Sequence, residues 1–197
     1  MTYFERLWSE LPDVPPEGFE PRLGLLLAAL PPRSRVLDVG CGAGYFGAAL
    51  AAAGHAVTGV DVASEAIRRA RLRCHGCELL PVGEGALPLP DGAFDAAWLG
   101  ELLEHVQDGI GLLAEVARVL APRGRLIVST PDHGRALRLR LGLSAAAFER
   151  HFDPRADHVR FFTARTLATL LDVTGFTEIA MRRAPRGSLF ATARAVG

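Results

Sequence analysis

The stretch from residue 35 to residue 47, RVLDVGCGAGYFG, constrains the fold of this chain more than any other. A short apolar run of β type carries Asp38 and is followed by glycines at alternate positions, Gly40, Gly42 and Gly44, before an Ala-rich helical run. A strand that turns through glycines into a helix N-terminus lets the backbone approach a ligand closely, because no Cβ stands in the way. The pattern predicts a βα unit that binds a nucleotide-type cofactor.

Residues 42–47 also read as GxGxxG, the dinucleotide fingerprint, and Asp61 follows about twenty positions further on. Taken alone, this pattern allows a nicotinamide-dependent oxidoreductase. The glycine series starts one step earlier, however, as DxGxGxG with an acid inside the strand at Asp38. A dinucleotide enzyme has no general use for a carboxylate at this position, so the longer pattern favours another class of cofactor.

The DxGxGxG pattern resembles the first motif of the class I S-adenosylmethionine-dependent methyltransferases. The resemblance implies that Asp38 orders the glycine loop and faces the methionine end of this cationic cofactor. Residues 82–95 are similar to the family's gDa…LPfpdgsFD segment, and residues 120–131 are similar to its L.PrGrLivstP stretch. We therefore expect a methyltransferase that uses S-adenosylmethionine.

The resemblance covers nearly the whole chain and implies an α/β fold. This fold is a Rossmann-like three-layer sandwich around a seven-stranded, mostly parallel sheet whose last strand is antiparallel. Helices are expected at residues 3–10, 21–30, 44–53, 64–73, 108–120 and 163–174. Strands are expected at residues 35–39, 55–61, 77–82, 94–99, 125–130, 176–183 and 189–195. We expect residues 1–34 to form an N-terminal helical cap and residues 35–197 the methyltransferase domain, with the long connection at 131–162 inserted as a lid over the acceptor substrate.

Residues at the ends of the second and fourth strands are expected to contact the cofactor. Asp61 ends the second strand, where an acid can accept hydrogen bonds from both ribose hydroxyls, and Val62 would lie against the adenine. Gly100 ends the fourth strand, where the resemblance places backbone beside the methionine moiety. The family's usual adenine-binding Asp falls on Gly83 here. Either Glu84 takes that role through a loop shift, or backbone groups hold the adenine amine.

Arg22 is a further candidate for the cofactor site. The sequence RLG that begins at Arg22 is similar to a stretch before the first strand of the ubiquinone-pathway O-methyltransferases, in which an Arg helps to hold the cofactor. A solvated Arg at the start of a helix is the alternative.

Directly after the fourth strand stands the sequence ELLEH, in which Glu101, Glu104 and His105 have the spacing i, i+3 and i+4. On a helical turn these side chains share a face, and two carboxylates with an imidazole suit a divalent metal, here Mg, Mn or Zn. The ExxEH pattern resembles the metal site of the ubiquinone-biosynthesis O-methyltransferases and of the small-RNA 2′-O-methyltransferases. In the latter group a further His completes the coordination, and His158 lies in the corresponding place.

Two chemical routes fit a hydroxyl acceptor. A bound metal would favour the deprotonated hydroxyl, whereas without a metal His105 or His158 would take the proton as a general base. The histidines at 133 and 151 are less well placed alternatives to His158. A metal-independent enzyme that methylates N or C, with His105 as base, remains open, as does a catalytically idle cofactor-binding domain that acts as a regulator.

Composition limits the classes of partner. The chain has 22 acidic and 22 basic side chains, so its net charge gives no reason to expect nucleic-acid binding. The longest apolar run, residues 23–30, is too short to span a bilayer, and the N-terminus lacks the pattern of a signal peptide. We expect a cytoplasmic protein that acts on a small-molecule acceptor.

The cysteines and the aromatic residues of the lid allow narrower predictions. Three cysteines in such a chain suggest reduced thiols, and CHGC at residues 74–77 lacks the second Cys pair of a zinc knuckle. The phenylalanines of the lid, with arginines between them, would suit a flat or amphipathic molecule, although core packing explains aromatic residues equally well. These residues are Phe148, Phe152, Phe161 and Phe162.

Overall fold

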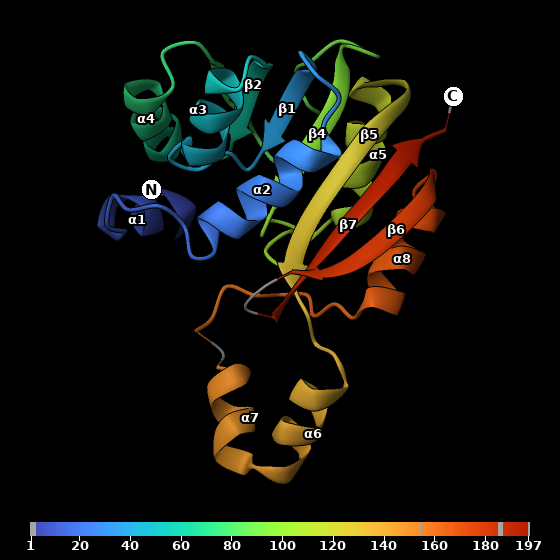
Figure 1. Cartoon of the computed structure of the whole chain (residues 1–197). Coiled ribbons are helices and arrows are strands. Elements are labelled where there is room, and N and C mark those ends of the chain that lie inside the picture. The colour runs from blue at the N-terminus through green and yellow to red at the C-terminus, as the bar shows by residue number, and fades with distance from the viewer. Residues whose placement is uncertain (1–2, 154, 185–186, 197) are drawn as a thin grey trace.

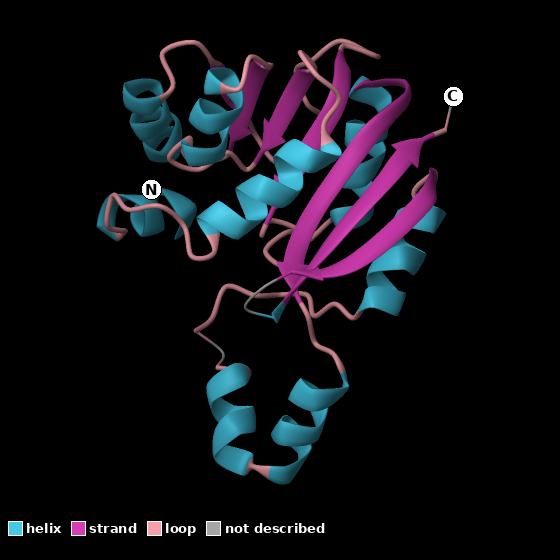
Figure 2. Ribbon diagram, in the orientation of Figure 1, coloured by secondary structure: helices cyan, strands magenta, loops and turns pink. Residues whose placement is uncertain are grey.

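The structure, a computed structural model, describes residues 3–153, 155–184 and 187–196. A seven-stranded sheet with the order β3-β2-β1-β4-β5-β7-β6 forms its centre (Figures 1 and 2). The strands are β1 (Arg35–Val39), β2 (Ala56–Asp61), β3 (Glu78–Pro81), β4 (Phe94–Gly100), β5 (Leu120–Pro131), β6 (Phe176–Ala184) and β7 (Ser188–Ala195). Strand β7 runs antiparallel to both of its neighbours, β5 and β6, while β1 to β5 pair in parallel. The predicted sheet and its antiparallel last strand are confirmed.

Helices cover both faces of the sheet, because the central strands carry apolar side chains on each face. The helices are α1 (Tyr3–Glu10), α2 (Phe19–Ala29), α3 (Tyr45–Ala52), α4 (Ser64–Arg73), α5 (Gly109–Val119), α6 (Arg135–Leu143), α7 (Ala145–His151) and α8 (Ala164–Val173). On one face, Val36 and Trp98 pack with side chains of α2 and α3. On the other face, Leu37 and Leu99 pack with side chains of α5 and α8. Buried on both sides, these strands read as nearly continuous apolar runs.

None of the helices within the described ranges has the length and apolar character that crossing a membrane requires.

The segment 131–162, expected as a long connection, contains two helices. Helix α6 has the sequence RALRLRLGL, and α7 begins after Ser144, whose side chain accepts a hydrogen bond from the amide of Ala147. Ala, Leu and Arg are strong helix formers, so the composition of this segment carried a helical signal. Figure 1 shows the two helices as a hairpin that projects away from the sheet.

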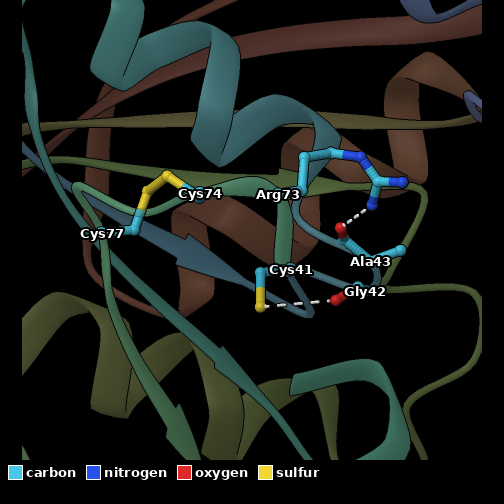
Figure 3. Close-up of a disulfide and its surroundings, with 6 residues drawn as sticks. All are labelled: Cys41, Gly42, Ala43, Arg73, Cys74 and Cys77. Atoms are coloured by element: carbon cyan, nitrogen blue, oxygen red, sulfur yellow. Dashed lines mark hydrogen bonds between the residues drawn. A yellow bond between two sulfur atoms is a disulfide. The ribbon is translucent and has the colours of Figure 1, made fainter. Parts of the chain in front are cut away.

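The expectation of three reduced thiols is wrong for two of the cysteines. Cys74 and Cys77 form a disulfide at the C-terminal end of α4, while Cys41 is free and buried (Figure 3). A tight turn follows the helix, with the amide of Cys77 donating to the carbonyl of Cys74 at 3.2 Å. This turn brings the two Cα atoms to 5.4 Å, within the range that a disulfide spans.

Candidate cofactor and metal site

The candidate site lies at the carboxyl ends of the central parallel strands. Strands β2, β1 and β4 are neighbours in the sheet and run in the same direction, so the residues that follow them meet at one edge. Gly40 follows β1, and Asp61 and Gly100 end β2 and β4. This edge is where open α/β sheets bind their ligands.

The glycine loop after β1 needs glycine for two independent reasons. Gly42 has a φ of +53°, a conformation that side chains with a Cβ rarely adopt. A Cβ at Gly42 would also lie 2.7 Å from Cη2 of Trp8, and one at Gly40 would lie 2.7 Å from Cδ1 of Leu102. The loop is therefore covered by α1 and by the turn that follows β4, and both contacts leave no room for a larger residue.

Asp61 anchors this loop from the end of β2. Its Oδ2 accepts a hydrogen bond from the amide of Gly42 at 3.0 Å, and its Oδ1 accepts one from the amide of Ala63 at 2.9 Å. Burial raises the pKa of Asp61, and the hydrogen bonds from these amides act in the opposite direction. Each carboxylate oxygen keeps a further lone pair, with which it could accept from a ribose hydroxyl. Val62, next along the chain, is 40% exposed and leaves a free apolar surface beside Asp61.

Asp38 is a buried acid that the surrounding fold does not satisfy. The residue is 2% exposed, and its Oδ2 has no hydrogen-bond partner among the described residues. Burial and the charge of Asp61 raise the pKa of Asp38 to about 7, while a hydrogen bond from the amide of Gly47 acts in the opposite direction. A cationic ligand at the glycine loop would compensate this carboxylate, so Asp38 fits the sulfonium and ammonium groups of S-adenosylmethionine.

Arg22 is buried, and the alternative of a solvated Arg is wrong. It is 6% exposed, and its guanidinium lies over the ring of Phe46, 5.4 Å from the centroid. Its Nη1 is 3.5 Å from Oε1 of Glu101, while Nη2 donates to the carbonyl of Glu17 at 2.5 Å. Burial lowers the pKa of Arg22, and the charge of Glu101 opposes this effect. The arginine therefore links α2 to the end of β4.

Contrary to the expectation from the sequence, Glu101 does not join the other two residues of ExxEH. The expectation assumed a helical turn, but Glu101 has a φ of +52° and only a short turn follows at 103–105. The chain changes direction at Glu101, so its carboxylate reaches Arg22 instead of converging with Glu104 and His105. A residue other than Gly in this conformation costs free energy and is often found at functional sites.

Glu104, His105 and His158 do come together. Each offers one ligand atom, and these atoms lie within 4.8 Å of one another, in the one such group of three or more that the described residues contain. The rings of His105 and His158 meet edge to face, with centroids 4.8 Å apart. A carboxylate with two imidazoles is a donor set that suits Zn or Mn better than Mg.

Glu104 is held in place through both its side chain and its backbone. Its Oε2 accepts a hydrogen bond from Oγ1 of Thr130 at 3.0 Å, and its backbone carbonyl accepts from the amides of Val159 and Arg160. Its Oε1 is buried and lacks a hydrogen-bond partner in the described part of the chain. Burial and the charge of Glu101 raise the pKa of Glu104 to about 8. A divalent cation would satisfy the free oxygen, so the residues present fit a metal.

The two histidines differ in their surroundings. Nδ1 of His105 lies 3.3 Å from the backbone carbonyl of Asp157 and 3.3 Å from its Oδ2, contacts that orient the ring. Burial, and after it the charge of His105, lowers the pKa of His158. This direction favours the neutral imidazole, the form that a metal ligand or a general base requires.

The cleft that contains this cluster has a volume of about 310 Å³. Its lining includes Glu17, Arg22, Glu101, Glu104, His105 and His158. Ser188, at the start of β7, also lines the cleft and was not expected from the sequence. Thr130 was missed too, although its place at the end of β5, beside β4, was a signal that could have identified it.

A pair of histidines lies near the cluster, and the sequence had suggested them only as alternatives. Nε2 of His133 is 3.0 Å from Nε2 of His151, and the rings of both pack around Phe161. His133 comes from the start of the expected lid, while His151 and Phe161 come from its second half. Glu84, proposed for the adenine, is exposed in the loop after β3, and its role stays a prediction.

A family model described as a methyltransferase domain matches residues 16–180 of the chain. The chain is 33% identical over 169 residues to the demethylmenaquinone methyltransferase of Tropheryma whipplei, with 78% of this chain and 71% of that protein covered. It is 36% identical over 132 residues to the ubiquinone biosynthesis O-methyltransferase of Xanthomonas oryzae, with 64% of this chain and 54% of that protein covered. The chain thus spans about half the length of the second relative.

Solved structures share the fold. A chain from the complex between the Haloferax volcanii Trm112 methyltransferase activator and a methyltransferase superposes with a TM-score of 0.78 at 19% identity, covering 100% of this chain and 99% of that chain. The 1,6-didemethyltoxoflavin-N1-methyltransferase of Burkholderia thailandensis, with bound S-adenosylhomocysteine, superposes with a TM-score of 0.72 at 25% identity. That match covers 97% of this chain and 81% of the other.

Proposed function

Because this chain belongs to the family of S-adenosylmethionine-dependent methyltransferases, we propose that it methylates a hydroxyl group of a small molecule with the help of a divalent metal. The convergence of Glu104, His105 and His158 carries this proposal. The cluster is joined to the cofactor loop through Leu102, whose side chain packs against Gly40. A metal in this place would therefore lie in the cleft next to the glycine loop.

The cofactor would be held by residues from three strand ends. Asp61 would accept hydrogen bonds from the ribose, and Val62 offers its exposed side chain to the adenine. Asp38 would face the positively charged methionine end, and Gly100 would bring backbone close to it. When bound, S-adenosylmethionine would supply an electrophilic methyl group on a sulfonium, for transfer to a nucleophile aligned with the S–CH₃ bond and with S-adenosylhomocysteine as the leaving group.

The metal-assisted reading rests on the unsatisfied oxygen of Glu104. A divalent cation would act as a Lewis acid on the acceptor hydroxyl and favour its ionised form. Thr130 holds the carboxylate of Glu104, and Asp157 orients His105, in the way that neighbouring groups usually orient metal ligands. The sequence predicted Glu101 as the fourth metal ligand, but in the structure Glu101 pairs with Arg22. We propose that Glu101 positions Arg22 in the cleft instead of binding the metal.

The names of the relatives support a small-molecule acceptor. One of them is a demethylmenaquinone methyltransferase and another an O-methyltransferase of ubiquinone biosynthesis. Their acceptors are small molecules, and the second name specifies oxygen. The N1-methyltransferase among the solved structures supports a second candidate, methylation of nitrogen, for which we propose a route that uses no metal. In that case His105, oriented by Asp157, would act as the general base.

Metal binding can be measured directly by titration calorimetry with Mn²⁺ and Zn²⁺. We expect one ion per chain in the wild type, and a loss of affinity of about 10- to 1,000-fold in Glu104→Gln and in His158→Asn, since each removes one ligand. Glu10→Gln and His75→Asn, which change exposed residues of the same types, are the matched controls.

Methyl transfer to a panel of phenols and amines, with and without EDTA, separates the two candidates. The metal-assisted proposal predicts methylated phenols and a loss of activity with EDTA that Mn²⁺ restores. Unchanged activity in EDTA would exclude it, and a loss in His105→Asn alone would then favour the base mechanism.

A further inference from the structure

The α6–α7 hairpin, residues 135–151, is set apart from the rest of the molecule. Figures 1 and 2 show it extending beyond the edge of the sheet, joined to the body through the stretches before α6 and after α7. The first of these stretches carries His133 and the second carries His158, which lines the cleft. The hairpin is thus close in sequence to the site, although the proposed chemistry does not use it.

Helix α6 exposes an apolar stripe on the side opposite to its packed side. Leu141 is 8% exposed, whereas Leu139 and Leu143 are 64% and 77% exposed. Residues four positions apart lie on the same side of a helix, so Leu139 and Leu143 form one stripe. Successive residues are about 100° apart, which places Leu141 on the opposite side. On α7, Phe148 adds a further apolar side chain that is 50% exposed.

The same hairpin carries positive charge. It contains four arginines and one acid, Glu149, so its formal charge is 4 − 1 = +3, while the whole chain has a net charge of zero. Arg138 and Arg140 precede and follow Leu139, and the helical spacing places them on either side of the apolar stripe. All four arginines, at positions 135, 138, 140 and 150, are exposed.

We propose that the α6–α7 hairpin docks on an anionic lipid surface through the exposed face of α6, which carries Leu139 and Leu143. A narrow apolar stripe between arginines is the pattern of a helix that lies in the membrane interface. Leu139 and Leu143 would enter the boundary between headgroups and acyl chains. Arg138 and Arg140 would reach lipid phosphates, because their long side chains can extend away from the apolar stripe toward the headgroups.

Docking at the hairpin would bring the cleft close to lipid. The acceptor could then reach the cleft from the membrane, which suits an amphipathic molecule. This consequence rests on the proposed function, whereas binding to the lipid surface does not depend on it. Affinity for vesicles and affinity for S-adenosylhomocysteine are therefore measured separately.

The test is cosedimentation of the full chain with phosphatidylcholine vesicles that contain or lack phosphatidylglycerol. We expect the partition coefficient to be at least about tenfold higher with phosphatidylglycerol, since each basic residue near an anionic surface adds attraction. Added salt should reduce this difference. Equal partitioning into both kinds of vesicle, or none into either, would overturn the proposal. The second outcome would point to an acidic protein as the partner of the hairpin.

Two variants place the binding on the hairpin. Arg138→Glu/Arg140→Glu should lower partitioning at least about tenfold, while Arg165→Glu/Arg182→Glu, an equal change of charge at exposed residues of α8 and β6, should change it much less. An equal loss of partitioning in the two double variants would show that only the net charge matters and would refute docking by the exposed face of α6.

The apolar stripe is tested in the same way. Leu139→Ser/Leu143→Ser should weaken binding, while Leu72→Ser/Val173→Ser, which changes residues exposed by 68% and 65% elsewhere, should not. All variants should bind S-adenosylhomocysteine as the wild type does, since their changes lie outside the cofactor site. As a second readout, Leu139→Trp should show a blue shift of its fluorescence on vesicles with phosphatidylglycerol, and an unchanged spectrum would contradict insertion.

Discussion

Individual carboxyl groups carry much of the chemical signal in this molecule, and Asp38 is the clearest of them. It is enclosed between the sheet and α3, close to the glycine loop, and one of its oxygens lacks a hydrogen-bond partner within the described residues. Such a group lowers the stability of the free protein, because its charged form is poorly solvated. A bound cation would reverse this penalty, so the carboxyl is suited to binding and not to structure.

The pKa of Asp38, raised to about 7, predicts how stability depends on pH. Between pH 4 and pH 7 the unfolded chain has lost this proton while the folded chain keeps it, so the free energy of unfolding falls as the pH rises. Relative to Asp38→Asn, the wild type should lose stability across this window, by up to about 1.4 kcal/mol per pH unit, and then level off.

Urea denaturation at several pH values measures this difference. Asp172→Asn, at an exposed position near the end of α8, is the matched control. It keeps Asp38, so the difference in free energy of unfolding between it and the wild type should stay nearly constant over the same range. A difference between wild type and Asp38→Asn that is constant from pH 4 to pH 8 would contradict the assignment.

At this scale, sequence patterns predicted residues whose position follows from a strand end. Asp38, Asp61 and Gly100 lie where the pattern put them, because the sheet alone determines their place. The separation of Glu101 from Glu104 and His105 was not predictable, since it depended on one backbone angle at Glu101. The burial of Arg22 was missed because it results from packing on Phe46, which lies far along the chain.

At the scale of single elements, α4 has a structural role beyond covering the sheet. Arg73, its last residue, donates a hydrogen bond to the carbonyl of Ala43 in the glycine loop, as Figure 3 shows. Its guanidinium also lies over the ring of Tyr45, 3.6 Å from the centroid. The disulfide begins at the next residue, Cys74. The end of α4 therefore connects the disulfide to the cofactor loop.

Loss of this disulfide should loosen the glycine loop. Cys74→Ser/Cys77→Ser should lower the free energy of unfolding by roughly 2 kcal/mol, the loop-closure value for so short a loop. It should also weaken binding of S-adenosylhomocysteine, because Arg73 would be held less firmly. Thermal unfolding and calorimetry measure the two effects.

Dithiothreitol provides the control for this prediction. Treated wild type should behave like the double variant, and the double variant should not respond to the reductant. If alkylation and mass spectrometry of the untreated protein found both thiols free, the predicted role of the disulfide would be refuted.

The elements themselves were mostly predictable. Apolar periodicity, and glycines where elements end, mark β1, β2, β4 and the helices between them. Exceptions came from segments whose structure depends on tertiary contacts. The hairpin of α6 and α7 lies outside the sheet, so the pattern of the sheet did not indicate it. The turn after α4 gave a disulfide because of its tight geometry, which the spacing CHGC does not determine.

For the whole molecule, the fold brings distant parts of the chain to one edge of the sheet. Trp8 covers Gly42 from the N-terminal helix, and His158 reaches Glu104 from the segment before α8. The fold class was predictable because its motifs are local and recur along the chain. The completed site was not, since it is assembled from contacts between segments far apart in sequence. The proposed domain division at residue 34 and the cytoplasmic location stay predictions.

The central claim is that the glycine loop binds the cofactor beside a metal held by Glu104, His105 and His158. Anomalous diffraction from a crystal grown with S-adenosylhomocysteine and Mn²⁺ tests it most directly. We predict one anomalous peak in contact with these three residues, and an adenosine whose ribose hydroxyls donate to Asp61. A glycine loop without bound nucleoside, or a cluster without an anomalous peak, would contradict the claim.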